Sequence, residues 1–158
     1  MAKFAKLKFF SLVIFLGILA GCASISIPNY IQDEHPYKKK FYARFDDVLK
    51  AASQTLTALG WEVDGTSDPS VFERQRAVAD PLEKQVLLFS KLRQTPLFIG
   101  SRYARLNLYL QSSPDNTTEV EIRTLTVTTL IFKKFTLYRD DRVAEILFRE
   151  IEERLNQG

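Results

Sequence analysis

The chain has 158 residues and a formal net charge of +3, with 22 lysines and arginines against 19 aspartates and glutamates. Its length suits a single domain with a sizeable hydrophobic core. A single cysteine excludes a disulfide within the chain and a metal site built from several cysteines.

The first residues carry the most specific pattern in the chain. Three lysines precede an apolar stretch over residues 9–20, which is the layout of a secretory signal peptide. The stretch is shorter than the roughly 20 apolar residues that a bilayer-spanning helix needs. It ends in Leu19-Ala20-Gly21-Cys22, which resembles the lipobox of bacterial lipoproteins. The resemblance implies cleavage after residue 21 and a diacylglyceryl group on Cys22. The alternatives are an ordinary signal peptide cut near Ala23 and an uncleaved anchor.

Removal of residues 1–21 would change the charge balance. This leader contains three of the basic residues and no acidic one, so the chain from Cys22 onward has a formal charge of zero. The positive net charge therefore gives no indication of a nucleic-acid partner. In the enterobacterial lipoproteins that the leader resembles, an Asp after the cysteine retains the protein in the inner membrane. Ala23 stands there in this chain, so the resemblance implies an outer-membrane protein facing the periplasm in a host with two membranes.

Residues 22–37 are expected to form a flexible tether after the lipidated cysteine. The segment shows no helical or alternating apolar period, and its prolines Pro28 and Pro36 disfavour regular structure. His35, the only histidine, lies here, where a loose chain cannot orient an imidazole for catalysis. Lys38-Lys39-Lys40 follows; we expect the start of a solvated strand, and contact with anionic lipid head groups is the alternative.

A single domain is expected over residues 38–158, beginning with a short strand at 41–42 and a helix at about 46–59. The helix is predicted from apolar residues at helical spacing, namely Phe45, Val48, Leu49, Ala52, Leu56 and Leu59. Asp46 is expected to cap its first amides, and Gly60 to end it in the left-handed conformation. Two strands, at 61–63 and 71–77, are expected around the turn-rich segment between them.

Alternating apolar residues dominate the second half. Strands are expected over 84–92 and 106–110, followed by a turn at 112–116. Residues 130–138 give mixed signals between a further strand and irregular chain.

The strand after that turn has two apolar sets of opposite parity. Val120 and Ile122 fall on one face, whereas Leu125 and Val127 fall on the other. A bulge or bend near residues 123–124 is expected, because it would return both sets to one face.

A last helix is predicted from a stripe of apolar residues that starts just after Asp140-Asp141 and consists of Val143, Ile146, Leu147, Ile151 and Leu155. Two amphipathic helices need a common apolar surface, which an antiparallel sheet supplies. The expected fold class is α+β in two layers, with both helices packed on one face of an antiparallel sheet in β-α-β-β-β-β-β-α order. This layout, across about 40–158, is similar to the helix-grip domains of BamC-like envelope lipoproteins.

The sequence offers no catalytic constellation. The acidic pairs Asp46-Asp47 and Asp140-Asp141 stand where helices begin, so capping accounts for them better than acid–base chemistry. Gly65 and Gly100 are isolated, so there is no glycine-rich phosphate loop. We expect a protein without enzymatic activity, metal or cofactor. A hydrolase of wall or lipid that uses only carboxylates is the remaining enzyme alternative, because two acids on separate strands leave no motif.

Two apolar stretches lie where polar turns are expected. Residues 95–100 include Leu97, Phe98 and Ile99, the candidate partner contacts, and residues 130–135 mix apolar side chains with two lysines. If exposed, either stretch would form a docking patch for a protein or a lipid surface. Our preferred interpretation places both in the core, at the ends of the sheet.

The predicted function is that of an envelope lipoprotein attached to the membrane through covalent lipid on Cys22. Its domain is expected to bind or scaffold another envelope protein or lipid, without catalysis and without nucleic acid. The alternative is a carrier that holds a small amphiphile between the helices and the curved sheet. A cavity of at least about 300 Å³ there would favour the carrier, and a solid core would favour the scaffold.

Overall fold

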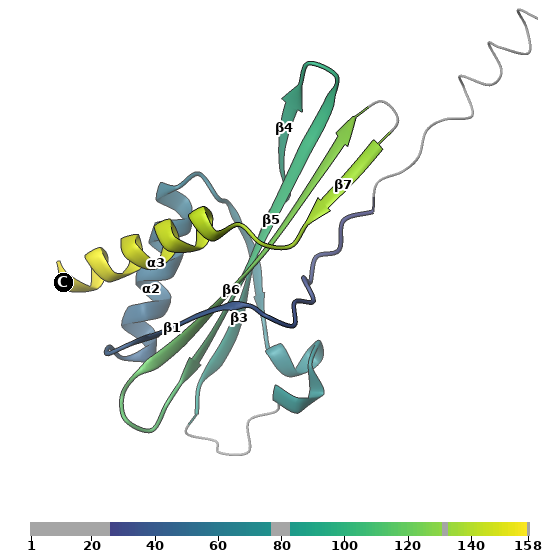
Figure 1. The fold of residues 1–158 in the computed structure, drawn as a ribbon. Helices are drawn as coiled ribbons and strands as arrows, with labels where there is room; N and C mark the ends of the chain where they lie inside the picture. The colour runs from purple at the N-terminus through teal and green to yellow at the C-terminus, as the bar shows by residue number, and fades with distance from the viewer. Residues whose placement is uncertain (1–25, 77–82, 131–132, 158) are drawn as a thin grey trace, which may run out of the picture.

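A computed structural model describes residues 26–76, 83–130 and 133–157 of the chain. In these residues two helices pack on one face of a seven-stranded antiparallel sheet, which confirms the predicted α+β class (Figure 1). The elements in chain order are β1 (Tyr37–Phe41), α2 (Phe45–Ala58), β2 (Val63–Ser67), the 3₁₀ turns η1 (Pro69–Val71) and η2 (Arg74–Arg76), β3 (Gln85–Ser90), β4 (Arg93–Leu97), β5 (Gly100–Ser112), β6 (Thr118–Leu130), β7 (Lys133–Leu137) and α3 (Asp141–Asn156).

The two long strands β5 and β6 form the axis of the sheet. They pair over 13 residues each, and different strands flank their two halves. In one half, the strands lie in the order β1-β6-β5-β3-β2. In the other half, β4 pairs with β5 and β7 pairs with β6. The helices cover the first half, and the β4–β5 and β6–β7 hairpins project past them (Figure 1).

Both helices lie where the apolar periodicity predicts them. Gly60, with a φ of 76°, ends α2 in the left-handed conformation as expected. The carboxylate of Asp140 accepts a hydrogen bond from the Val143 amide at 3.1 Å and caps α3. Asp46 makes no such bond; the predicted cap is wrong, and its carboxylate accepts from Lys84 Nζ at 2.8 Å instead.

The space between the helices and the sheet is filled by apolar side chains. They come from both helices and from four strands, and include Phe41, Val48, Leu56, Leu88, Leu106, Leu108, Leu110, Ile122, Leu147 and Ile151. Trp61 closes this core at the side of the projecting hairpins. Apolar side chains thus occupy the region between the two layers where the carrier alternative needs a cavity.

β6 contains no bulge. Its pairing with β5 runs along the whole strand without a shift of register. Val120 and Ile122 pack beneath the helices, whereas Leu125 and Val127 contact Ile31 in a second, smaller cluster. The predicted bend is thus wrong, because the second apolar set keeps its own face and is covered there by another part of the chain.

The segment after β2 also departs from the prediction. Instead of a strand at 71–77, the described part forms η1 and η2. Asp68 accepts a hydrogen bond from the Ser70 amide at 2.8 Å, and Pro69 stands at the start of η1. A turn capped by Asp68 and beginning at Pro69, which suits the first position of a helical turn, thus occupies the start of this segment in place of the strand.

Residues 26–36, here called the N-terminal arm, lie on the sheet face opposite the helices. They contain no helix or strand, as expected, but Ile31 is 0% exposed and its amide donates to Asn107 Oδ1 at 2.6 Å. The ring of Tyr30 stacks on that of Phe72, with 4.7 Å between centroids. Over residues 26–36 the chain is therefore an ordered arm and not the flexible tether predicted for 22–37, whose residues 22–25 lie outside the described residues.

Candidate functional site

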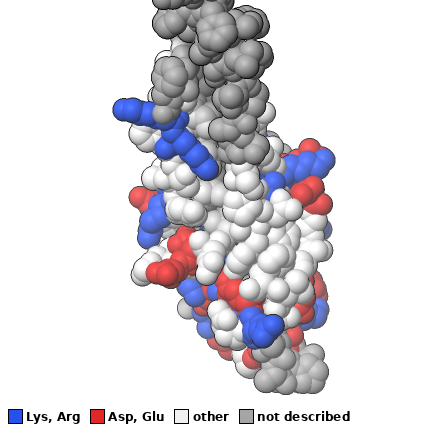
Figure 2. Space-filling view, turned by 90° about the vertical axis from the view of Figure 1, so that its right-hand side faces the viewer, with Lys and Arg blue, Asp and Glu red and all other residues white. Residues whose placement is uncertain are grey.

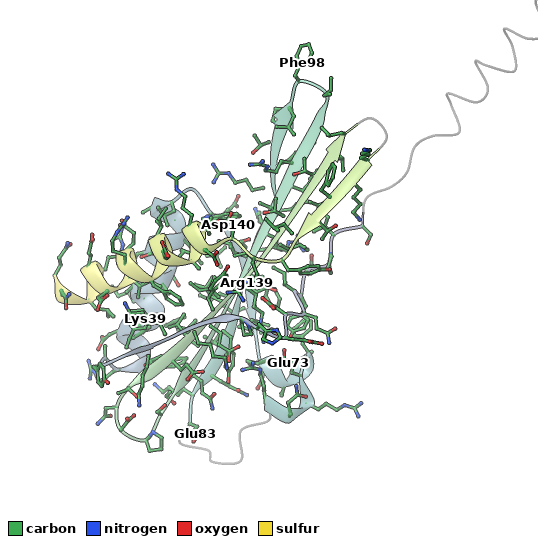
Figure 3. The ribbon with its side chains drawn as sticks, viewed as in Figure 1. Lys39, Glu73, Glu83, Phe98, Arg139 and Asp140 are labelled. Atoms are coloured by element: carbon green, nitrogen blue, oxygen red, sulfur yellow. The ribbon has the colours of Figure 1, made fainter. Side chains whose placement is uncertain are left out.

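The candidate contact residues lie at the tip of the β4–β5 hairpin. Phe98 is fully exposed, at 102%, and Ile99 is 49% exposed; Leu97 is the least exposed of the three. Figure 3 shows Phe98 at the far end of the molecule from the turn between β5 and β6. The interpretation that places them in the core is wrong, since the hairpin projects beyond the helices and none of the described residues forms a second layer over its tip. Cys22, the predicted lipid site, lies outside the described residues.

The second apolar stretch is also exposed where the structure describes it. All five residues of β7 are exposed, with Phe135 at 54% and Leu137 at 57%. Ile131 and Phe132 lie outside the described residues. Placement in the core is therefore wrong for β7 as well, which pairs with β6 and, among the described strands, lies at the edge of the sheet.

We call residues 93–104, 126–130 and 133–137 the hairpin end. Its sequence contains four basic residues, Arg93, Arg102, Lys133 and Lys134, and no aspartate or glutamate. Among the ion pairs of the described residues, none involves these four side chains. The remaining surface mixes both signs, as Figure 2 shows for one face. The hairpin end is thus a locally basic projection on a domain without excess charge.

An open cleft of about 660 Å³ separates the hairpin end from the helices. Its floor is the helix-side face of the sheet, where Ala104, Thr126 and Leu137 lie side by side on three neighbouring strands. Trp61 and Val143 form the wall towards the core.

Polar groups border this cleft on the β4–β5 side. Arg93 and Arg102 line it, and the guanidinium of Arg93 lies 5.5 Å from the centre of the Trp61 ring. Threonine hydroxyls lie on its floor and Phe135 on its outer rim. Apolar walls with two guanidinium groups suit a ligand that has an apolar body and an anionic group. Sequence reasoning missed this cleft, because its residues come from six separate segments.

A buried ionic cluster lies on the opposite face, beneath the arm. Arg76 donates to both carboxylate oxygens of Glu121, at 3.1 and 2.8 Å, and Arg123 donates to Glu73 at 2.7 Å. Tyr30 of the arm donates its hydroxyl hydrogen to Glu73. Glu73 lies below the arm in Figure 3. The cluster ties the arm and the η1–η2 segment to the sheet.

The charge states of this cluster follow from its pairing. Burial raises the pKa of Glu73, but hydrogen bonds from Arg123, Tyr30 and Arg76 outweigh burial and lower the pKa to about 2. Burial likewise raises the pKa of Glu121, and hydrogen bonds from Lys38 and Arg76 lower it by more. Both carboxylates are therefore ionised at neutral pH. Neither lines the cleft, so they do not supply the acid–base pair that a hydrolase there would need.

The described residues contain no group of three or more histidine, cysteine or acidic side chains placed to hold a metal ion. Neither α2 nor α3 has the length and hydropathy to cross a bilayer, and the described part of the chain holds no other such helix.

In sequence, the chain matches no protein-family model and no curated protein. Its function therefore has to be inferred from its own residues and their geometry.

Proposed function

We propose that this protein is an envelope lipoprotein, anchored through a diacylglyceryl group on Cys22, with a binding or scaffolding domain that carries out no catalysis. The observation that carries the proposal is Leu19-Ala20-Gly21-Cys22 at the end of a basic and apolar leader. Exposed apolar and basic side chains on the hairpin end, together with apolar side chains between the helices and the sheet, support a domain that makes contacts rather than one that encloses a substrate.

The anchor is tested by changing the thiol that would carry the lipid. Wild-type protein is expected in the detergent phase of a phase-separation assay and to incorporate a labelled fatty acid. Cys22→Ser should incorporate none, and it should either become soluble or persist as the uncut precursor. Ser24→Ala, a change of similar size two residues on, serves as the control and should behave as wild type. A cleaved Cys22→Ser chain that stays fully in the membrane would refute the lipid anchor.

The location is a separate part of the proposal. Because Ala23 and not Asp follows Cys22, we propose residence in the outer membrane, facing the periplasm, for a host with two membranes. Fractionation of envelope membranes on a density gradient should place the protein with outer-membrane markers. Ala23→Asp should move it toward the inner-membrane fractions. Wild-type protein among inner-membrane markers would contradict the assigned location.

A second candidate function, binding of an anionic amphiphile, is favoured by the open cleft. Its volume of about 660 Å³ falls within the roughly 300–1,000 Å³ typical of small-molecule sites. The cleft lies beyond the end of the helices, not between the helices and the sheet. Trp61, the only tryptophan, lines it, so its fluorescence should change when a lysophospholipid binds. Arg102→Ser should weaken that response, whereas Lys50→Ser on α2 should leave it unchanged. An unsaturable response, equal in both variants, would exclude the site.

A further inference from the structure

We propose that the hairpin end rests on the bilayer that holds the lipid of Cys22, with Leu97, Phe98 and Ile99 inserted among the head groups. Arg93, Arg102, Lys133 and Lys134 would then face anionic lipid. The inference rests on the proposed lipid anchor and adds an orientation and a second membrane contact to it.

The course of the N-terminal arm places the anchor and the hairpin end on the same side of the molecule. Ile27 packs into the cluster formed by Ile31, Leu125, Val127 and Tyr103. Tyr103 and Val127 are paired across β5 and β6, inside the hairpin end. The first described residues of the arm therefore lie against the hairpin end, on the face of β5 and β6 opposite the helices.

Chain lengths then limit how far the lipid can lie from the tip. Five residue steps separate Cys22 from Ile27, which corresponds to at most about 18 Å of extended chain. Gly100, at the base of the tip, is three residues along β5 from Tyr103, about 10 Å away. A free tether over residues 24–37 could instead reach about 50 Å. Docking of the arm therefore keeps the domain within a few residue lengths of the lipid.

The chemistry of the tip fits a head-group region. Phe98 is the most exposed large apolar side chain among the described residues, and Leu97 and Ile99 flank it. Aromatic and aliphatic side chains beside lysines and arginines are the composition of interfacial membrane contacts. The sequence of the hairpin end has no carboxylate to repel anionic lipid. Since the chain from Cys22 onward has no net charge, attraction to such a surface requires a local group of basic residues, and the hairpin end supplies one.

The position of the tip can be measured directly on the lipidated protein. Ile99→Cys and, at the opposite turn, Asp115→Cys each receive an environment-sensitive fluorophore. The labelled proteins are reconstituted into vesicles of phosphatidylcholine with 30% phosphatidylglycerol, some of whose lipids carry a nitroxide quencher. We expect a blue-shifted, quenched signal from position 99 and a water-like, unquenched signal from position 115. Equal, water-like signals from both positions would overturn the inference.

The contributions of charge and apolar surface are separable in the same assay. Replacing Lys133 and Lys134 with serine should lower the ratio of bound to free hairpin ends about 5-fold per charge removed. Phe98→Ser should also reduce quenching at position 99, whereas Lys50→Ser on α2 is the matched charge control and should not. Quenching that is unaffected by the lysine and Phe98 changes would overturn the assigned contact.

Three outcomes distinguish the possible failures. Protein that does not float with the vesicles contradicts the lipid anchor itself. Protein that floats, but whose label at position 99 stays exposed to water, contradicts the orientation alone. If that label is shielded only in native envelope membranes and not in vesicles of pure lipid, the hairpin end contacts a protein, and the inference is wrong.

Discussion

Replacement of Ile31 with alanine tests whether the N-terminal arm belongs to the folded domain. Ile31 is fully buried against Leu125 and Val127 on the face of the sheet that the helices leave open. The change removes three buried carbon atoms, each contributing about 0.8 kcal/mol by transfer from water. With the cavity that remains, the expected loss in the free energy of unfolding is about 2–4 kcal/mol.

Urea denaturation followed by fluorescence measures this loss, since Trp61 is the only tryptophan and is buried in the main core. Ile99→Ala is the matched control, because it makes the same deletion at the exposed tip and should change stability by no more than about 0.5 kcal/mol. If Ile31→Ala is no more destabilising than this control, the arm is not part of the cooperative unit, and the reasoning from its docking fails.

The remaining predictions concern the core, the ionic cluster and the tip. Leu56→Ala and Leu147→Ala, both in the core beneath the helices, should each cost about 2–5 kcal/mol in denaturant unfolding; losses below 1 kcal/mol would contradict their packing. The folded pKa of Glu73, about 2, lies below its ordinary value of 4.5, so its stabilising effect is complete above pH 4.5 and is lost as the pH falls toward 2. Glu73→Gln should therefore be less stable than wild type at pH 6, and the two stability curves should converge between pH 4.5 and 2; a constant difference across this range would refute the assigned pKa. Phe98→Ser should leave the melting temperature of the detergent-solubilised protein nearly unchanged, and a large decrease would place Phe98 in a core after all.

Periodicity in the sequence was sufficient to predict the two helices, the fold class and the interior strands. In α2 and α3 the apolar stripe is regular, and one face of each helix is buried by the same layer throughout. β6 violates that condition, because its apolar side chains change face where the covering element changes from helix to arm. A pattern read along one strand cannot reveal which other segment covers it.

The arm and the hairpin end were mispredicted for a related reason. Ile31 is an isolated apolar residue in an irregular segment, and its partner Asn107 lies 76 residues further on. In the hairpin end, the apolar residues of the sequence suggested that the segment is buried. Its side chains are exposed because the strands extend beyond the helices that cover the rest of the sheet. One signal was available in the sequence: residues 93–104 and 126–137 contain basic residues and no acidic ones, which is unusual for a core segment and typical of a surface that meets anions.

The change of face along β6 also secures the alignment of the sheet. A slip of one residue against β5 would turn Val120 and Ile122 away from the helices and, at the same time, Leu125 and Val127 away from the arm. In a strand with a single apolar face, a slip exposes apolar side chains that one layer covers. In β6 it exposes two sets of apolar side chains, which are covered by separate parts of the chain. Misaligned pairing, from which domain swapping and aggregation begin, is therefore disfavoured independently at both ends of the longest strand pair.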